Sequence, residues 1–172
     1  IHYLGGNFYS CAPSDVAQPI QKGNDWVRCV DRVQVLADIA KQYNITLAME
    51  VVCRYEGYLI NTAAEGVKMV KAINRSNVGL MLDTFHMNIE EDNFASAIHT
   101  AGEYLFYLHT GECNRRVPGS GRIPWNEIAY ALTDINFNGP ITMEPFITTN
   151  GSIGKDLGVW RDLSYGATDL EM

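Results

Sequence analysis

The sequence has few cysteines, and none are spaced as metal-ligand pairs. Its four cysteines among 172 residues form no CxxC pair and no Cys/His cluster of the zinc-ribbon kind. We therefore expect free thiols and a cytoplasmic protein. Long apolar runs are also absent, since no stretch approaches the roughly 20 residues that a membrane span needs. We expect no membrane partner.

Positive charge is in deficit as well. Thirteen Lys and Arg residues oppose 20 Asp and Glu residues, for a formal net charge of −7. Binding to a phosphate backbone rewards positive charge, so we expect no nucleic-acid partner. Neither a GxGxxG after a strand nor a GxxxxGK[ST] motif occurs, which argues against a nucleotide-phosphate site.

What the chain does contain is an alternation of short apolar runs and amphipathic segments. Five apolar runs predict β-strands at residues 2–9, 45–52, 78–82, 104–109 and 140–143. Helical spacing predicts a helix at 25–43 with Asn24 or Asp25 as N-cap, a helix capped by Thr62, and helices at 94–101, 125–135 and around 157–163. Strands that are apolar on both faces and alternate with helices predict an α/β fold with a parallel sheet.

Ionisable residues end four successive predicted strands: Glu50, Asp83, His109 and Glu144. They lie about one strand–helix repeat apart, and equivalent strand ends of a parallel sheet converge on the mouth where (β/α)-barrel active sites lie. Three carboxylates and one imidazole suit Mn²⁺, Mg²⁺ or Co²⁺, and a divalent ion would offset the repulsion between the carboxylates. Singly, such residues are most often helix caps or structural groups; four in register favour a shared metal or catalytic site.

Five long stretches carry a family resemblance: MEVVCRYEGYLINTAAEG (49–66), MLDTFHMNIEED (81–92), HTGECNRRVPGSGRIPW (109–125), ITMEPF (141–146) and VWRDLS (159–164). They resemble the D-tagatose 3-epimerase / D-psicose (D-allulose) 3-epimerase family, ketose 3-epimerases on a xylose-isomerase-like TIM (β/α)₈ barrel. The resemblance implies Mn²⁺ or Co²⁺, with Mg²⁺ as a further candidate, held by the four strand-end residues. It also implies that Glu56, His86 and Arg115 hold the O1–O3 end of a ketose substrate.

The resemblance further implies an isomerase that interconverts C3 epimers of free ketohexoses (D-fructose and D-psicose, D-tagatose and D-sorbose) through a cis-enediolate. Glu50 and Glu144 would be the acid/base pair: one removes the C3 proton, which the C2 carbonyl acidifies, and the other returns a proton on the opposite face. The metal would act as a Lewis acid. His86 and Arg115 would donate hydrogen bonds to charge developing at O2. A homo-oligomer, dimer or tetramer, is implied for the family.

The length departs from that family, because 172 residues are fewer than the roughly 250 of a typical TIM barrel. We therefore expect residues 1–172 to be a single partial-barrel domain of about five βα units. It would match approximately strands 4–8, with the N-terminal units and the last helix missing. The alternatives are another sugar isomerase of this barrel type (aldose–ketose or hydroxypyruvate isomerase) and a non-catalytic half-barrel that needs a partner chain. An AP-endonuclease-like phosphodiesterase is disfavoured by the net charge and by only four histidines.

Overall fold

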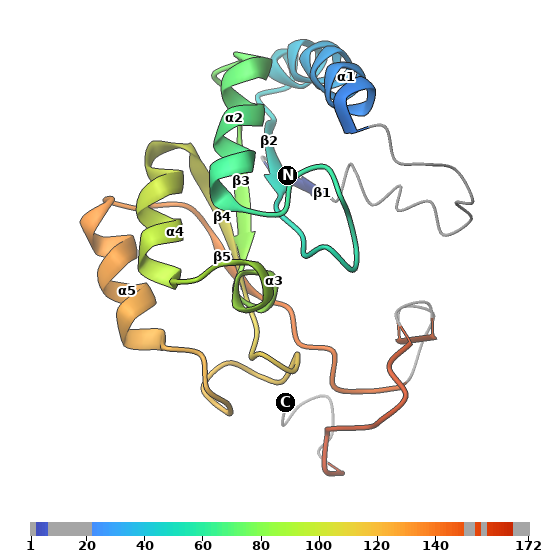
Figure 1. The fold of residues 1–172 in the computed structure, drawn as a ribbon, viewed down its shortest axis with the longest axis vertical. Coiled ribbons are helices and arrows are strands. Elements are labelled where there is room, and N and C mark those ends of the chain that lie inside the picture. The colour runs from blue at the N-terminus through green and yellow to red at the C-terminus, as the bar shows by residue number, and fades with distance from the viewer. Residues whose placement is uncertain (1–2, 7–21, 150–153, 156–157, 167–172) are drawn as a thin grey trace.

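The strands form one parallel sheet in sequence order. The structure, a computed structural model, describes residues 3–6, 22–149, 154–155 and 158–166 (Figure 1). Its five-stranded sheet has the order β1-β2-β3-β4-β5, and every neighbouring pair is parallel. The strands are β1 (Tyr3–Gly6), β2 (Thr46–Glu50), β3 (Val78–Asp83), β4 (Leu105–Thr110) and β5 (Ile141–Met143). The predicted parallel α/β architecture is confirmed; the other residues of the expected 2–9 strand lie outside the described part.

Helices connect the parallel strands and cover one face of the sheet. The connections are α1 (Lys22–Gln42), α2 (Ala63–Ile73), α4 (Phe94–Ala101), which continues into a 3₁₀ turn (Gly102–Tyr104), and α5 (Trp125–Asp134). Figure 1 shows them side by side in front of the sheet, with the short helix α3 (Thr84–Glu90) at its lower end, where β3 stops. None of the helices that the structure describes combines the length and apolar character that a bilayer crossing requires.

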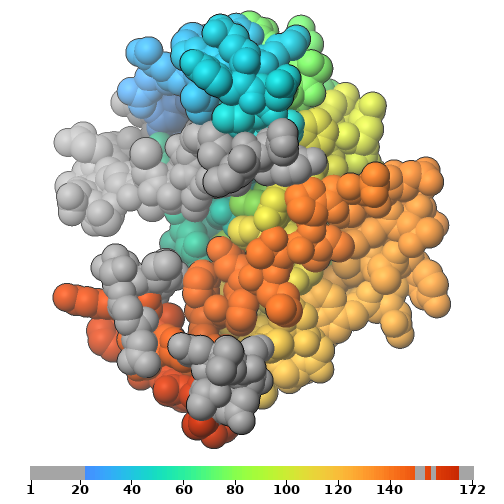
Figure 2. All heavy atoms as spheres, turned by 180° about the vertical axis from the view of Figure 1, so that it is seen from behind, coloured from blue at the N-terminus to red at the C-terminus, as the bar shows by residue number. Residues whose placement is uncertain are grey.

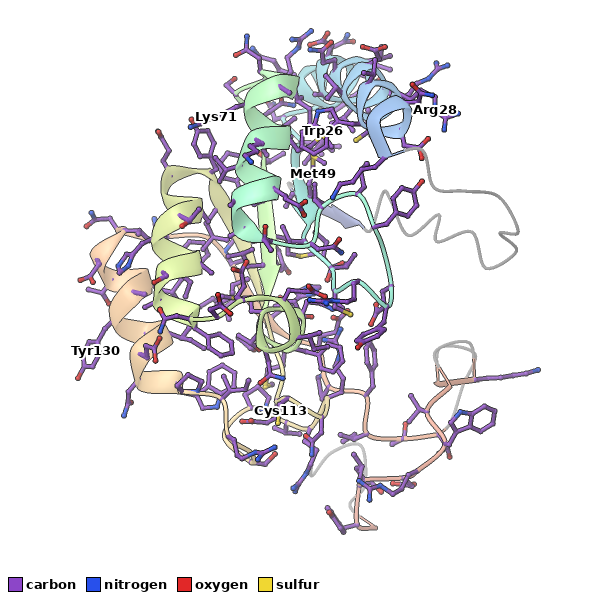
Figure 3. The ribbon with its side chains drawn as sticks, in the orientation of Figure 1. Trp26, Arg28, Met49, Lys71, Cys113 and Tyr130 are labelled. Carbon is purple, nitrogen blue, oxygen red and sulfur yellow. The ribbon has the colours of Figure 1, made fainter. Side chains whose placement is uncertain are left out.

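The core lies between this helical layer and the sheet. Leu47 and Met49 of β2 and Leu80 and Leu82 of β3, alternate residues on one face, are all 0% exposed. Figure 3 shows Met49 between the sheet and the helices, whereas Tyr130 of α5 points outward. Burying one such aliphatic side chain contributes about 1.5–3 kcal/mol. The alternation therefore leaves the intervening residues of each strand on the opposite face of the sheet.

That opposite face carries polar side chains toward the carboxyl ends of the strands. Figure 2 shows the molecule from behind, with the residues that lead into and out of β5 (orange) at the surface. Thr142 of β5, the register partner of His109, is exposed on this face. The Tyr107 hydroxyl lies 2.6 Å from the Thr142 hydroxyl, which links β4 to β5. The helical layer thus leaves this face free to carry a site.

Two helix starts test the expected caps. Thr62 caps α2 as predicted, since its hydroxyl accepts from the Glu65 N–H at 3.2 Å. The expected cap at Asn24 or Asp25 is wrong, because α1 already begins at Lys22. The Asp25 carboxylate instead lies in the first turn, where it accepts from the Tyr58 hydroxyl at 2.5 Å. A negative charge there is favourable because it meets the positive end of the helix dipole.

Of the α-helices α1 to α5, α3 is the one that the sequence pattern does not predict. It follows β3 without a loop, because Asp83 both ends the strand and caps the helix, accepting from the Phe85 N–H at 2.7 Å. The helix expected around 157–163 is wrong for residues 158–163, which form turns and bends. Trp160 in this segment is 91% exposed, so its apolar residues provide no buried face that would stabilise a helix.

Candidate metal centre and active site

The four strand-end residues converge at the carboxyl edge of the sheet. Glu50 ends β2, Asp83 ends β3, His109 lies near the end of β4, and Glu144 directly follows β5. Asp83 and His109 are register partners, while Glu50 pairs with Met81. One ligand atom of each of the four residues lies within 4.8 Å of the others. The structure thus brings together the whole set that the spacing selects.

The electrostatics of this cluster are unbalanced. Nδ1 of His109 is buried without a hydrogen-bond partner and lies 3.2 Å from Glu144 Oε2 and 3.7 Å from Glu50 Oε1. Burial lowers the pKa of His109, but the two glutamates outweigh burial and raise that pKa to about 10. Burial raises the pKa of Asp83 to about 7, against the opposing effect of Arg115. Both pKa values are raised, which means that added positive charge stabilises the cluster.

The donor set fits a divalent cation. A metal bound here would displace the proton of His109, because Nδ1 is buried without a hydrogen-bond partner beside two carboxylate oxygens and its lone pair would then be free to bind the ion. Three carboxylates carry −3, and the one positive charge of Arg115 at Asp83 and Glu144 leaves −2, which an M²⁺ ion balances. Oxygen-rich sites with one imidazole suit Mn²⁺, Co²⁺ or Mg²⁺ better than thiophilic ions.

Arg115 lies over the cluster. Its Nη1 donates to Asp83 Oδ2 at 2.6 Å and to Glu144 Oε2 at 3.1 Å. Its guanidinium carbon lies 4.2 Å from the ring centroid of Phe85 and 4.8 Å from that of Phe146. Two aromatic faces and two carboxylates therefore fix the plane of this cation.

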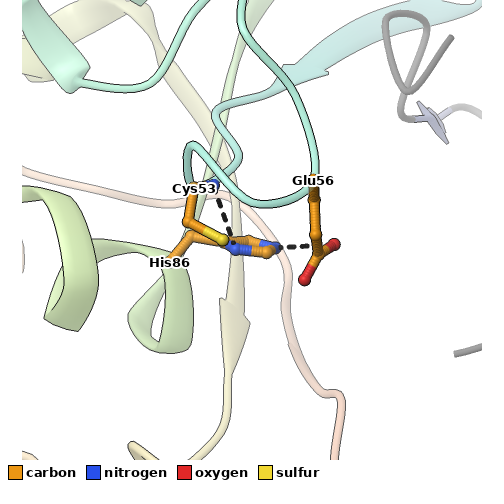
Figure 4. A group of neighbouring side chains, drawn as sticks. All are labelled: Cys53, Glu56 and His86. Atoms are coloured by element: carbon orange, nitrogen blue, oxygen red, sulfur yellow. Dashed lines mark hydrogen bonds and ion pairs between the residues drawn. The ribbon is translucent and has the colours of Figure 1, made fainter. Parts of the chain in front are cut away.

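Next to Arg115, His86 is held between Cys53 and Glu56 (Figure 4). The backbone N–H of Cys53 donates to Nδ1 of His86 at 3.2 Å, while Nε2 lies 3.8 Å from Glu56 and 3.9 Å from Glu50. Burial, with Arg115, lowers the pKa of His86 to about 3, so the ring is neutral. A neutral ring whose Nδ1 accepts carries its proton on Nε2, which faces the carboxylates. Burial also raises the pKa of Glu56.

Cys53, Glu56 and His86 are themselves close enough to hold a metal, but their surroundings disfavour it. The Nδ1 lone pair of His86 already accepts from the Cys53 N–H, and the cationic Arg115 has its Nη2 3.2 Å from Nε2. Burial also raises the pKa of the Cys53 thiol, and thiolate is the form that binds metals. This trio therefore fits an oriented imidazole better than a second metal centre.

A cavity of about 430 Å³ opens beside these groups. Its lining includes Glu56, Phe85, Arg115 and Phe146, together with Val159, Trp160, Arg161 and Leu163 of the tail segment. Sequence reasoning assigned no substrate role to Phe85 or to the 159–163 segment, although both lie in the stretches that carry the family resemblance. The position of Phe85 beside His86 is the signal that could have identified it. The volume is in the range of small-ligand sites.

Comparison with known proteins adds the family. A family model described as a xylose isomerase-like TIM barrel matches residues 1–163. The chain is 54% identical to a D-psicose 3-epimerase from Agrobacterium fabrum over 172 residues, which are 100% of this chain and 60% of the relative. It is 53% identical to a D-psicose 3-epimerase from Ruminiclostridium cellulolyticum over 98% of this chain and 58% of that protein.

The similar solved structures are also D-psicose 3-epimerases. A crystal structure of a D-psicose 3-epimerase in the presence of D-fructose has a TM-score of 0.94 at 53% identity and covers 99% of this chain and 59% of its own. A D-psicose 3-epimerase with D-tagatose from Clostridium cellulolyticum H10 has a TM-score of 0.92 at 50% identity, with coverage of 99% and 59%. The chain thus spans about 60% of the length of the relatives that it matches.

Proposed function

The chain belongs to the xylose isomerase-like TIM barrel family, and from that membership we propose that it carries the catalytic groups of a metal-dependent ketose 3-epimerase. The substrates would be free ketohexoses, D-fructose/D-psicose or D-tagatose/D-sorbose. The observation that carries the proposal is the approach of Glu50 and Glu144 to one atom, Nδ1 of His109, from strands that are not neighbours in the sheet. Two carboxylates at one centre are what C3 inversion requires.

The proposed reaction moves a proton on and off C3. The C2 carbonyl acidifies the C3 hydrogen, so a carboxylate within reach can remove it. The second carboxylate then delivers a proton to the other face of the planar cis-enediolate, which inverts the configuration. Glu50 and Glu144 serve as this pair, and each acts as base in one direction and as acid in the other.

Glu50, Asp83, His109 and Glu144 would hold the divalent ion, with Mn²⁺ or Co²⁺ as the first candidates and Mg²⁺ next. The chemistry that such an ion supplies when bound is Lewis-acid stabilisation of negative charge on the sugar oxygens. The buried, unpartnered Nδ1 of His109 and the net negative charge of the cluster support this assignment.

Three further residues would bind the reacting end of the ketose. Arg115 and the Nε2–H of His86 are donors directed at the centre where oxyanion charge develops. Glu56 is an acceptor for a hydroxyl, since it lines the cavity and faces His86. The rings of Phe85 and Phe146 flank Arg115 and line the same cavity, so they would contact a bound sugar on this side.

We further propose that residues 1–172 form one partial-barrel domain that corresponds approximately to strands 4–8 of the family barrel. The whole protein would be a cytoplasmic homo-oligomer, a dimer or a tetramer. The share of the relatives that the chain covers supports the first point. Among the described residues, Cys53 and Cys113 are free thiols, which supports a reducing compartment.

The test is turnover of D-fructose in D₂O with Mn²⁺. We expect D-psicose that carries deuterium at C3, because the proton returns from a carboxylate that exchanges with solvent. Product without deuterium would indicate an internal hydride shift and a different isomerase. Glu50→Gln and Glu144→Gln should each abolish turnover, by at least about 10²-fold, whereas the exposed Glu103→Gln serves as the matched control. Full activity of either site variant contradicts the acid/base assignment.

A further inference from the structure

Glu112 is a fully buried carboxylate that the proposed reaction does not use. Its side chain is 0% exposed. Three neutral donors face it: the N–H of Gly119 at 2.7 Å, the N–H of Ile123 at 3.1 Å and the indole Nε1 of Trp125 at 2.9 Å. Burial raises the pKa of Glu112, but these donors outweigh burial, so the net shift is downward and the group is ionised at neutral pH. Burying a charged carboxylate is costly unless hydrogen bonds satisfy it, so these N–H groups and Glu112 must keep fixed positions relative to one another.

The same residue fixes the near end of the 112–125 segment, which we call the arginine loop. The N–H of Glu112 donates to the carbonyl of Arg116 at 3.0 Å, and the carbonyl of Glu112 accepts from the N–H of Arg115 at 2.9 Å. The backbone of Glu112 therefore holds residues 115 and 116, while its side chain holds residues 119, 123 and 125. Glu112 thus links the two ends of the loop.

The conformation that the loop imposes on Arg115 is an unfavourable one. Arg115 has a φ of +59°, in the left-handed region that costs a non-glycine residue roughly 1 kcal/mol or more. From this backbone position the guanidinium reaches between Phe85 and Phe146 to Asp83. Such a conformation persists only where the surrounding contacts over-determine it.

Gly121 provides an independent observation of how closely the loop packs on the carboxylate. A Cβ placed on Gly121 would lie 2.2 Å from Glu112 Oε2, far inside contact distance. Any side chain at position 121 would therefore displace the carboxylate or the loop. Glycine here is required by the close approach, and not by its φ.

We propose that Glu112 is a positioning residue that holds the arginine loop in the conformation that directs Arg115 at the sugar. This inference rests on the proposed function, because Arg115 is assigned there to ketose binding. Without the carboxylate, the donors at residues 119, 123 and 125 lose their acceptor and Arg115 can relax to an ordinary φ. The guanidinium of Arg115 would then no longer be held in position to donate a hydrogen bond to the sugar.

The experiment compares Glu112→Gln and Gly121→Ala with the matched control Gly23→Ala, at which a Cβ meets nothing within 4 Å. In Glu112→Gln the amide NH₂ faces N–H donors, whereas Gly121→Ala keeps the carboxylate and displaces it. We expect both to raise KM for D-fructose about 10-fold with a smaller change in kcat. Gly23→Ala should keep the wild-type KM.

Two readouts separate positioning from a merely structural effect. In a double-mutant cycle, Glu112→Gln should raise KM no further in an Arg115→Ala background, because the effect acts through that guanidinium. Amide hydrogen exchange at Gly119 and Ile123 should accelerate in Glu112→Gln and in Gly121→Ala. The exchange measurement needs no activity, so it remains informative if the protein is not an epimerase.

Two outcomes overturn the proposal. One is a KM increase of the same size with and without Arg115, which would make Glu112 structural only. The other is unchanged exchange at residues 119 and 123 in both variants. If Glu112→Gln does not fold, Gly121→Ala gives the same two measurements with the buried charge retained.

Discussion

At the scale of single residues, several positions are fixed by close backbone or ring approach. Gly79 in β3 is one of them: a Cβ there would lie 2.2 Å from the ring of Phe106 on β4. Overpacking of this kind forces side chains off their rotamers or moves strands apart. The pairing of β3 with β4 places Asp83 beside His109, so packing at Gly79 bears on the site as well as on the core.

We therefore predict that Gly79→Ala lowers the free energy of unfolding by about 1–3 kcal/mol, measured by urea denaturation. The ring of Phe106 is the obstacle, so the double variant Gly79→Ala/Phe106→Leu should recover part of the loss. A single variant as stable as wild type, or no recovery in the double variant, would show that the ring does not limit this position.

The residues of the site differ in how far the sequence alone could identify them. Glu50, Asp83, His109 and Glu144 follow from strand spacing, because parallel strands bring equivalent ends together. His86 and Arg115 needed the family resemblance, since nothing in their spacing marks them. Glu112 escaped both, because its partners are backbone N–H groups of a loop whose conformation no local pattern specifies.

At the scale of elements, α2 is stabilised at its start by one carboxylate. Glu65 accepts from Lys22 Nζ at 2.7 Å and from the Asn61 N–H at 2.8 Å, and its own N–H bonds to the Thr62 hydroxyl at 3.2 Å. Burial raises the pKa of Glu65, but the bond from Lys22 outweighs it, with the backbone N–H groups, so the net pKa is lowered. Helices α1 and α2 are thereby linked through the ionised carboxylate.

The pH dependence follows from that direction. Because the folded pKa lies below the unfolded value of about 4.3, ionised Glu65 stabilises the fold above that value. The contribution disappears as pH falls through the folded pKa. We predict that Glu65→Gln lowers the free energy of unfolding at about pH 6 by up to about 1 kcal/mol and makes it less dependent on pH down to about pH 3.

Urea titrations at each pH measure this effect. Lys22→Met keeps Glu65 but removes the ion pair, so it should flatten the pH dependence in part. Equal slopes for wild type and Glu65→Gln would contradict the assignment.

Helices that have an apolar face and follow a separate loop are the ones that the sequence predicts well. Helix α4 has the predicted bounds, Phe94–Ala101, and α5 (Trp125–Asp134) differs from its prediction by its last residue only. Helix α3 is short and starts directly at the strand end, so no loop signal precedes it. The helix expected around 157–163 is absent from residues 158–163 for the opposite reason. The apolar spacing is present there, but no buried face stabilises a helix.

At the scale of the whole molecule, the candidate metal site links the sheet from β2 to β5. Its ligands come from four strand ends between Glu50 and Glu144, so most of the described chain lies between the first and the last ligand. Arg115 and the raised pKa values of Asp83 and His109 show that positive charge is favoured at this cluster. An ion that binds only this folded arrangement must therefore stabilise the whole fold.

We predict that Mn²⁺ at about 100 times its Kd stabilises the chain by about 2.7 kcal/mol, which corresponds to a Tm increase of roughly 5–10 °C. Calorimetry with and without Mn²⁺ measures the increase, and EDTA should reverse it. Asp83→Asn keeps the shape of the side chain but removes one negative charge, so its Tm should respond little to Mn²⁺, whereas exposed Glu103→Gln should respond as wild type does. An equal Tm increase in Asp83→Asn would place the ion elsewhere, and no increase in wild type would contradict a metal site at these four residues.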